Sequence, residues 1–315
     1  MPERVLVEPG VCKRMSCIEC RVPLRIKRHM RKKHTISDNL YFSGVGIHSG
    51  EVVDCTLKPS DAGCVIFHRN DLNHREFRLD PGRVETRNST TLLVGRHRIQ
   101  TVEHLLAALS AMEIDSVVVE LSGGEVPVMD GSALPFIEAL RNAGLTSLEQ
   151  ARPHLRIREA FTLHEDEASI RMMPASRLEI FYRIQFDHPL IGIQEKELFM
   201  DKETFMREVA PARTFGFVRE LKALHERNLA RGAGLQNVIG LDDEGVVNGS
   251  LRFPDEFVRH KILDLIGDLS LLGYPLVGRV EADKAGHALH HKAVLHLAAH
   301  PDIFELTMDE SPQLQ

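Results

Sequence analysis

The order of predicted secondary structure constrains this chain most, because one order of elements runs through it twice. In each half, several short β-branched stretches precede a helix that carries a histidine, and a strand and a last helix follow. These histidine helices are expected over 102–112 and 255–272. The pattern predicts an α+β fold, with two layered α/β-sandwich domains of similar topology whose helices pack against sheets.

Breaks in this pattern predict the domain boundaries. Residues 1–31 are basic and lack a sustained period, so they form an extension that is not native if Met30 is the true initiator. Regular patterning predicts an N-terminal domain over 32–150 and a C-terminal domain over 155–302, joined by a short linker that contains Pro153. The polar tail after Pro301 is expected to fray.

Several local features are expected at the ends of elements. The string Ser43–Gly46 predicts a glycine turn between two strands, and Val126–Met129 reads as a strand. Thr101 precedes an apolar run and is a candidate N-cap for the helix that follows. These features predict the boundaries of short elements around the first histidine helix.

Composition narrows the function classes. Of the 315 residues, 43% are hydrophobic and 27% charged, which is typical of a globular protein, and aromatic residues reach only 5% with no Trp. Residues 1–34 hold ten Lys or Arg against three Glu, a balance of +7 within a total of −6, so the remaining residues sum to −13. Nucleic-acid binding through the basic N-terminus is therefore only an alternative hypothesis for this acidic body.

The cysteines and the hydropathy pattern indicate a cytoplasmic protein. Five cysteines are an odd number and do not suggest a disulfide framework, and no apolar run reaches the length of a membrane span or a secretory signal.

A second pattern in the N-terminal segment involves metal-binding residue types. Cys17 and Cys20 with His29 and His34 have the residue types of a zinc finger. Their spacing is shorter than that of such fingers, so this reading is the weaker one.

The predicted helix 257–268 contains a polar stripe. His260, Asp264 and Asp268 recur every four residues and therefore share one face of an otherwise apolar helix. A buried polar stripe needs partners, and a histidine and an aspartate one turn apart can bind one metal ion. A solvated face with a salt link between these residues is the alternative.

A further metal ligand must come from elsewhere, because catalytic zinc commonly uses three protein ligands and leaves one position for water. Glu103 and His104 stand side by side in the other apolar helix. One of them could bind metal while the other approaches the bound water. Neither HExxH nor HxxEH is present, since Gln100 occupies a position that the inverted motif needs. A buried core histidine is the alternative for His104.

Seven strings occur along the chain in a fixed order, namely SGVGIHSG at 43–50, TVEH at 101–104, VMDGS at 128–132, ARTFGF at 212–217, NGSLRF at 248–253, the run 257–268 and AGHAL at 285–289. With these strings, the chain resembles the bacterial UDP-3-O-acyl-N-acetylglucosamine deacetylases, zinc enzymes that commit precursor to lipid A synthesis. The resemblance covers about His34 to His300, and it implies an active site between the two domains.

The resemblance implies a ligand set and a catalytic base. His104, His260 and Asp264 match the zinc ligands of the family, and Glu103 matches the general base that acts on the zinc-bound water. The implied reaction is hydrolysis of the acetamide of UDP-3-O-acyl-N-acetylglucosamine with Zn²⁺ as cofactor. A related metallo-amidohydrolase acting on another acylated sugar is the alternative.

Other roles also follow from the resemblance. His287 would stabilise the oxyanion and protonate the leaving amine, Asp268 would hold and charge-pair it, Thr214 would hydrogen-bond the oxyanion, and Lys261 would meet the phosphates of the nucleotide sugar. A neighbouring carboxylate raises the pKa of a histidine, which is a physical reason for Asp268. Three further histidines in the same run could replace His287, namely His290, His291 and His296.

Substrate binding is expected in an insertion at about 214–248. Its apolar residues, Phe215 and Leu224 among them, would simply be core if read alone, whereas the resemblance implies a passage for the acyl chain of the substrate. His48 would either support the site or lie at the surface. The expected partner is an amphiphilic nucleotide sugar, without nucleic acid or stable membrane insertion, bound by a monomer.

Overall fold

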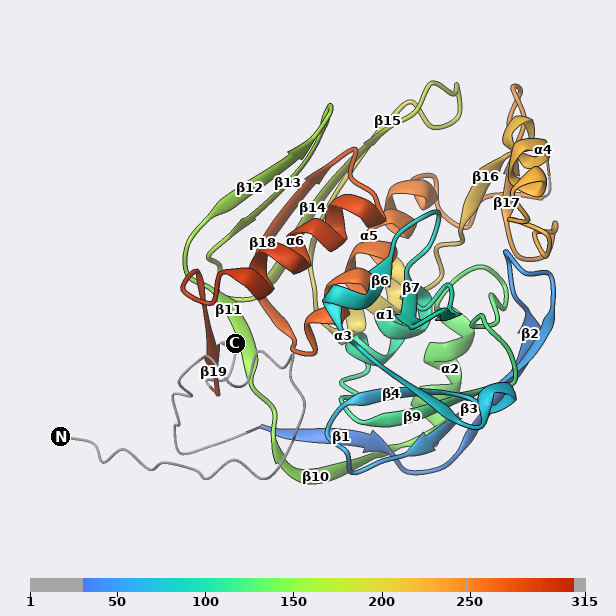
Figure 1. The fold of residues 1–315 in the computed structure, drawn as a ribbon. Coiled ribbons are helices and arrows are strands. Elements are labelled where there is room, and N and C mark those ends of the chain that lie inside the picture. The colour runs from blue at the N-terminus through green and yellow to red at the C-terminus, as the bar shows by residue number, and fades with distance from the viewer. Residues whose placement is uncertain (1–30, 248, 309–315) are drawn as a thin grey trace.

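The computed structural model describes residues 31–247 and 249–308, and its fold belongs to the α+β class, as predicted (Figure 1). Helices pack against several separate sheets of mixed direction. The basic extension lies outside the described residues except for Arg31, and so do Cys17, Cys20 and His29 of the finger-like pattern. The structure therefore tests neither the origin of the basic extension nor the finger-like pattern.

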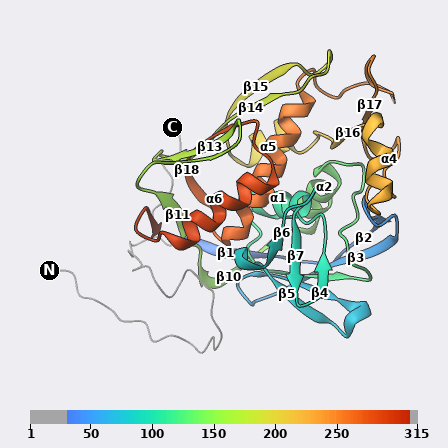
Figure 2. The ribbon, with the colours of Figure 1, turned by 45° about the horizontal axis from the view of Figure 1, so that its top comes forward.

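The first half of the chain forms a five-stranded sheet, with α1 (Glu103–Ala111) and α2 (Leu134–Ala143) lying over it (Figure 2). Alternate residues of its strands are buried, as the period of two requires, and Phe42 packs edge to face on Phe136 of α2 with 5.0 Å between ring centroids. The strand order is β2 (Leu40–Val45), β3 (Val52–Pro59), β9 (Val117–Leu121), β4 (Val65–Arg69) and β5 (Arg75–Arg78).

The second half forms a seven-stranded sheet around β18 (Leu276–Asp283). The helices α5 (Glu256–Leu269) and α6 (His287–Ala299) lie against it (Figure 1). No helix of the described residues, α5 included, is long and apolar enough to cross a membrane. β18 pairs with β11 (His154–Ile157), β13 (Ala168–Met173) and β14 (Leu178–Gln185), and the outer strands are β12 (Phe161–Glu165), β15 (Ile193–Phe199) and β19 (Phe304–Thr307).

Smaller elements complete the fold. Among residues 31–247 and 249–308, each strand pairs only with strands on its own side of the segment between Ala151 and His154. A domain boundary at this point stays a prediction. The first set of small elements is β1 (Lys32–Ile36) paired with β10 (Leu145–Ala151), and β6 (Val84–Glu85), β7 (Thr91–Val94) and β8 (His97–Ile99). The second set is α3 (Lys202–Thr204) with a π-helical turn (Phe205–Val209), then β16 (Phe215–Phe217), α4 (Val218–Glu226) and β17 (Ile239–Leu241).

The close approach of α1 and α5 joins the two halves of the chain. Gly267 makes this approach possible, because a Cβ atom at this position would lie 2.1 Å from the carbonyl oxygen of Glu103. Any other residue would push the helices apart. Tight helix packing thereby brings the start of α1 against the middle of α5, where the predicted polar stripe lies.

Two expected loop features are wrong. The chain turns at Gly46–Gly50 rather than at Ser43–Gly46, because Gly46 N donates to Glu51 O and Gly50 N donates to Gly46 O, so that β2 continues to Val45. Val126–Met129 is not a strand, since Val126 N donates to Gln100 O whereas Val128 N donates to Val45 O. Pro127 between them has no N–H to donate.

The expectations for Thr101 and for the tail are also wrong. Thr101 is not a helix cap, because it adopts a positive φ of 58° and its hydroxyl donates to Glu125 at 2.9 Å. The chain does not fray directly after Pro301, since β19 pairs antiparallel with β11 and buries Phe304 and Leu306. Two apolar residues at alternate positions suffice to hold this short strand against the sheet.

Candidate metal centre and active site

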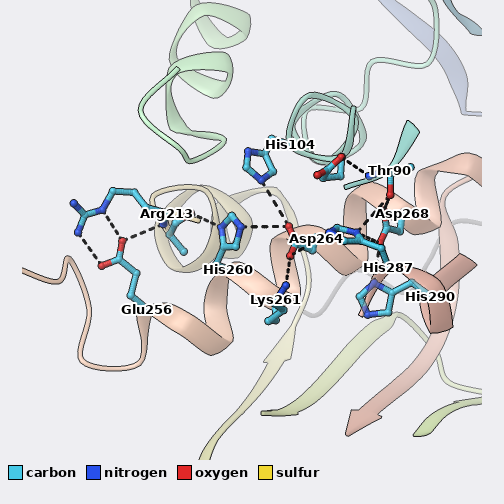
Figure 3. Close-up of polar contacts among 12 residues, drawn as sticks. Thr90, His104, Arg213, Glu256, His260, Lys261, Asp264, Asp268, His287 and His290 are labelled. Atoms are coloured by element: carbon cyan, nitrogen blue, oxygen red, sulfur yellow. Dashed lines mark hydrogen bonds and ion pairs between the residues drawn. The ribbon is translucent and has the colours of Figure 1, made fainter. Parts of the chain in front are cut away.

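Three predicted ligands converge between α1 and α5 (Figure 3). The ligand atoms of His104, His260 and Asp264 all lie within 4.8 Å of one another, and all three side chains are buried. Asp264 Oδ1 lies 3.7 Å from His104 Nε2 and 3.3 Å from His260 Nε2. Two imidazole nitrogens and a carboxylate oxygen form a donor set typical of zinc.

The hydrogen bonds of His260 fit a metal ligand. Its Nδ1 donates to the carbonyl of Ala212 at 3.0 Å, so the Nε2 lone pair faces Asp264. Burial, with His104 and Lys261 nearby, lowers the pKa of His260 to about 4 against the opposing effect of Asp264. His260 is therefore neutral at pH 7, as a ligating imidazole must be.

Asp264 is the centre of this cluster. Burial alone would raise its pKa, but Lys261, His260 and His287 hold the pKa well below its usual range. Its second oxygen, Oδ2, accepts a hydrogen bond from Lys261 Nζ at 2.8 Å. Asp264 is thus an anion with one oxygen toward the histidines and the other toward a lysine (Figure 3).

Glu103 opens α1 and is almost completely buried at 3% exposure. Burial raises its pKa to about 7, partly opposed by His287 and His104. Thr90 N donates to Glu103 Oε2 at 3.0 Å and fixes the carboxyl group. A carboxyl group with a pKa near neutrality can accept and return a proton at pH 7.

A second buried cluster surrounds Asp268, one turn farther along α5. Its Oδ2 accepts from His287 Nδ1 at 2.7 Å and from His290 Nδ1 at 2.8 Å, and Oδ1 accepts from the hydroxyl of Thr90. Burial would raise the pKa of Asp268, but His287 and His290 lower it to about 2. Burial would lower the pKa of His287, but Asp268 and Asp264 raise it to about 9. His287 is consequently a cation at neutral pH.

The three histidines that could replace His287 have different surroundings. His290 shares Asp268 with His287, whereas His291 Nε2 donates to the carbonyl of Pro81 at 2.7 Å and the His296 ring lies 4.5 Å from that of Phe161. His287 also lines the cavity described below. The geometry therefore favours His287 over His291 and His296 as the histidine that meets a substrate.

Sequence reasoning missed two partners of this cluster. Thr90 lies in the loop before β7, and its contact with Asp268 spans 178 residues, so no local pattern announces it. His290 follows His287 by three residues on α6 and thus lies on the same helix face. That spacing was a readable signal for His290.

A cavity of about 380 Å³ opens onto both clusters. Phe215 and Leu224 line it together with Thr214, and His48 lies there too, so all the predicted substrate contacts reach one space. Burial lowers the pKa of His48, against the opposing charge of Glu125. The remaining predicted residues at this cavity are Glu103, His104, His260, Lys261, Asp264 and His287, while Asp268 lies behind His287.

Comparisons with known proteins show which family this chain belongs to. The family model described as LpxC, UDP-3-O-acyl N-acetylglycosamine deacetylase, matches residues 33–299. A UDP-3-O-acyl-N-acetylglucosamine deacetylase of Geotalea uraniireducens is 43% identical over 290 residues, which cover 90% of this chain and 94% of the relative. Enzymes of the same name from Thioalkalivibrio sulfidiphilus and Myxococcus xanthus are 43% and 42% identical, covering 88% and 90% of this chain and 93% and 91% of the relatives. The chain therefore belongs to the UDP-3-O-acyl-N-acetylglycosamine deacetylase family, as the resemblance of its motifs indicated.

Proposed function

We propose that this protein is a zinc-dependent deacetylase that hydrolyses the acetamide of UDP-3-O-acyl-N-acetylglucosamine in lipid A biosynthesis, releasing acetate and the free amine. Family membership supports this substrate. One observation carries the chemistry, namely the convergence of His104 from α1 with His260 and Asp264 from α5 within 4.8 Å. Two helices far apart in sequence meet there beside an open cavity.

The donor set supports Zn²⁺ as the metal. The neutral His260, fixed by its hydrogen bond to Ala212, and the anionic Asp264 are in the protonation states that ligands require. Zn²⁺ held by these residues would supply Lewis-acid activation of water and of the amide carbonyl. The cavity beside the three ligands leaves space for water and substrate.

Glu103 is the proposed general base. An amide is a poor electrophile, so the attacking water must lose a proton as it adds to the carbonyl carbon. The raised pKa of Glu103, about 7, suits a group that accepts this proton and is still ionised at neutral pH. Glu103 and His104 both line the same cavity.

His287 is the proposed acid for the leaving group. With a pKa of about 9 it is protonated at neutral pH, and it can donate to the amine nitrogen as the C–N bond breaks. Asp268 holds it by a hydrogen bond of 2.7 Å and keeps it charged. Thr214, at the cavity wall, would hydrogen-bond the oxyanion of the tetrahedral intermediate.

The rest of the cavity suits an amphiphilic substrate. Lys261 has three donor hydrogens, so it can bind Asp264 and still meet a phosphate oxygen of the nucleotide. Phe215 and Leu224, together with other apolar residues of the insertion at about 214–248, would accept the acyl chain. The body of the chain is expected to act as a monomer in the cytoplasm, without nucleic acid.

The direct test is acetate release from UDP-3-O-acyl-N-acetylglucosamine by the purified full-length protein. Chelation should abolish turnover, and one equivalent of Zn²⁺ should restore it, because the ligand set holds one ion. An acylated amino sugar without the nucleotide serves as the control substrate and should react far more slowly. A folded, zinc-loaded protein that releases no acetate from the nucleotide sugar would contradict the proposal and favour the related amidohydrolase.

A further inference from the structure

His290 is completely buried on α6 and bridges two groups from other elements. Its Nδ1 lies 2.8 Å from Asp268 Oδ2 on α5, and its Nε2 lies 2.9 Å from the hydroxyl of Tyr182 on β14. Tyr182 is equally buried, and its hydroxyl also donates to the carbonyl of Ala285 at 2.7 Å. The segment 285–290, which includes His287, is thus held at both ends by the one hydroxyl of Tyr182 on β14.

The hydrogen bonds define which nitrogen of His290 carries a proton. Asp268 is a carboxylate and only accepts, so Nδ1 of His290 must donate to it. Burial lowers the pKa of His290, opposed by Asp268 and Asp264 of α5 and reinforced by His287 of its own helix. His290 is therefore neutral, and its bare Nε2 accepts from the Tyr182 hydroxyl, which shares its single proton with Ala285 O.

Three hydrogen bonds fix the orientation of the Asp268 carboxylate. One oxygen receives both His287 and His290, and the other receives Thr90, so rotation of the carboxylate breaks at least one bond. Without His290, Asp268 Oδ2 would keep His287 as its one donor in this cluster, and two of the three hydrogen bonds would remain. The carboxylate plane, and with it the imidazole of His287, would then be held less tightly.

We propose that His290 is a positioning residue for the deacetylation, whose Nδ1–H, oriented by Tyr182, holds Asp268 in the plane that aims His287 at the substrate. This inference rests on the proposed function, because it assigns a task to His290 through His287. His290 is absent from the cavity wall, so it acts on turnover rather than on substrate binding. The Tyr182 hydroxyl selects the tautomer on which that task depends.

The matched substitutions His290→Asn and His290→Leu test the inference. An asparagine side-chain nitrogen comes close to the position of Nδ1 and can still donate to Asp268, whereas leucine has a similar volume and no donor. We expect His290→Leu to lower kcat by about tenfold or more with KM within about twofold, as loss of a partner that orients a catalytic group does. His290→Asn should remain within about threefold of the wild-type kcat.

Tyr182→Phe is the second variant, because it keeps the packed ring and removes the hydroxyl. We expect kcat to fall by roughly threefold to tenfold at unchanged KM, since His290 loses the donor that fixes its tautomer. Zinc content and melting temperature accompany every variant. If His290→Leu does not fold, a fall in kcat for Tyr182→Phe at normal zinc content supports the inference, and a wild-type kcat overturns it.

Two further outcomes would overturn the inference in an active enzyme. They are a His290→Leu kcat within about twofold of wild type, and a His290→Asn kcat as low as that of His290→Leu. An inactive wild type would instead contradict the proposed function. Independently of turnover, the ¹⁵N spectrum of the histidine rings tests the orienting contact: an Nδ1–H form of His290 that Tyr182→Phe alters supports the inference, and an Nε2–H form overturns it.

Discussion

Asp264 and Asp268 lie one turn apart on α5, and both are buried, yet their neighbours differ. Beside Asp264, burial and the nearby cation of Lys261 hold His260 neutral, with a pKa of about 4. Beside Asp268, two carboxylates outweigh burial and keep His287 charged, with a pKa of about 9. The balance of charges around a buried histidine, rather than burial alone, therefore decides its protonation.

This difference gives one helix two tasks. A neutral histidine beside Asp264 can serve as the proposed ligand, because a lone pair is available for a metal. A charged histidine beside Asp268 can serve as the proposed acid, because it has a proton to give. The first half of the chain completes both clusters, with His104 for the former and Thr90 for the latter.

Among the substitutions that test this comparison, removal of a proposed metal ligand should have the largest effect on zinc content and turnover. His260→Ala should lose stoichiometric zinc and lower kcat/KM by at least roughly 10³-fold, because Lewis-acid stabilisation amounts to several kcal/mol. Zinc analysis and acetate release measure both effects. His291→Ala on α6 is the control, since its ring donates to Pro81 O outside both clusters, and it should keep zinc. Full zinc retention by His260→Ala would exclude this ligand set.

The base between the two clusters should have the next largest effect. Glu103→Gln should keep zinc but lower kcat by roughly 10²–10⁴-fold, because the amide side chain cannot accept the proton of the attacking water. Turnover at saturating substrate is the measurement, with zinc content as the internal control. Near-normal turnover would rule out Glu103 as the base.

The Asp268 cluster should influence the pH dependence of kcat/KM. The kcat/KM profile should rise as Glu103 ionises, with a pKa of about 7, and fall as His287 deprotonates, with a pKa of about 9. Bound Zn²⁺ would shift both limbs to lower pH, because a cation favours the carboxylate and disfavours the imidazolium. Asp268→Asn removes the charge that raises the pKa of His287, so the basic limb should move further down and kcat should fall by about 10²-fold. If the basic limb of the Asp268→Asn profile does not move, His287 is not the group whose deprotonation lowers kcat/KM.

A buried histidine at the start of β11 extends the comparison to stability. Burial, with Arg152 and Arg31 nearby, lowers the pKa of His154 to about 4. Because the unfolded chain takes up this proton at a higher pH than the folded protein, the depressed pKa lowers the free energy of unfolding by up to about 3 kcal/mol as the pH falls from about 6.5 to about 4. Chemical unfolding at pH 7 and pH 5 measures the loss. His154→Leu should reduce this pH dependence, whereas His164→Leu on an exposed position of β12 should not; equal pH dependence in both variants would refute the assignment.

The parts of the site that sequence could predict are those carried by helical spacing. His260, Asp264 and Asp268 recur every four residues, so their shared face on α5 followed from periodicity. The family strings then pointed to His104 and His287. Spacing also marks His290, although the His-rich run offered several candidates and no local rule chose among them.

Contacts between segments that are far apart in the chain could not be predicted from the sequence. Tyr182 meets His290 across 108 residues, and Thr90 meets Asp268 across 178, so neither contact leaves a local pattern. The turn at Gly46–Gly50 and the irregular path of Val126–Met129 depend on hydrogen bonds to other segments in the same way. Tertiary partners, rather than local propensity, set these details.

The proposed metal site can be located by an anomalous difference map at the zinc absorption edge, from crystals of the zinc-loaded protein. We predict one peak between α1 and α5, about 2.0–2.2 Å from His104 Nε2, His260 Nε2 and a carboxylate oxygen of Asp264. A zinc peak that lies elsewhere in the molecule, with none between these three side chains, would contradict this prediction.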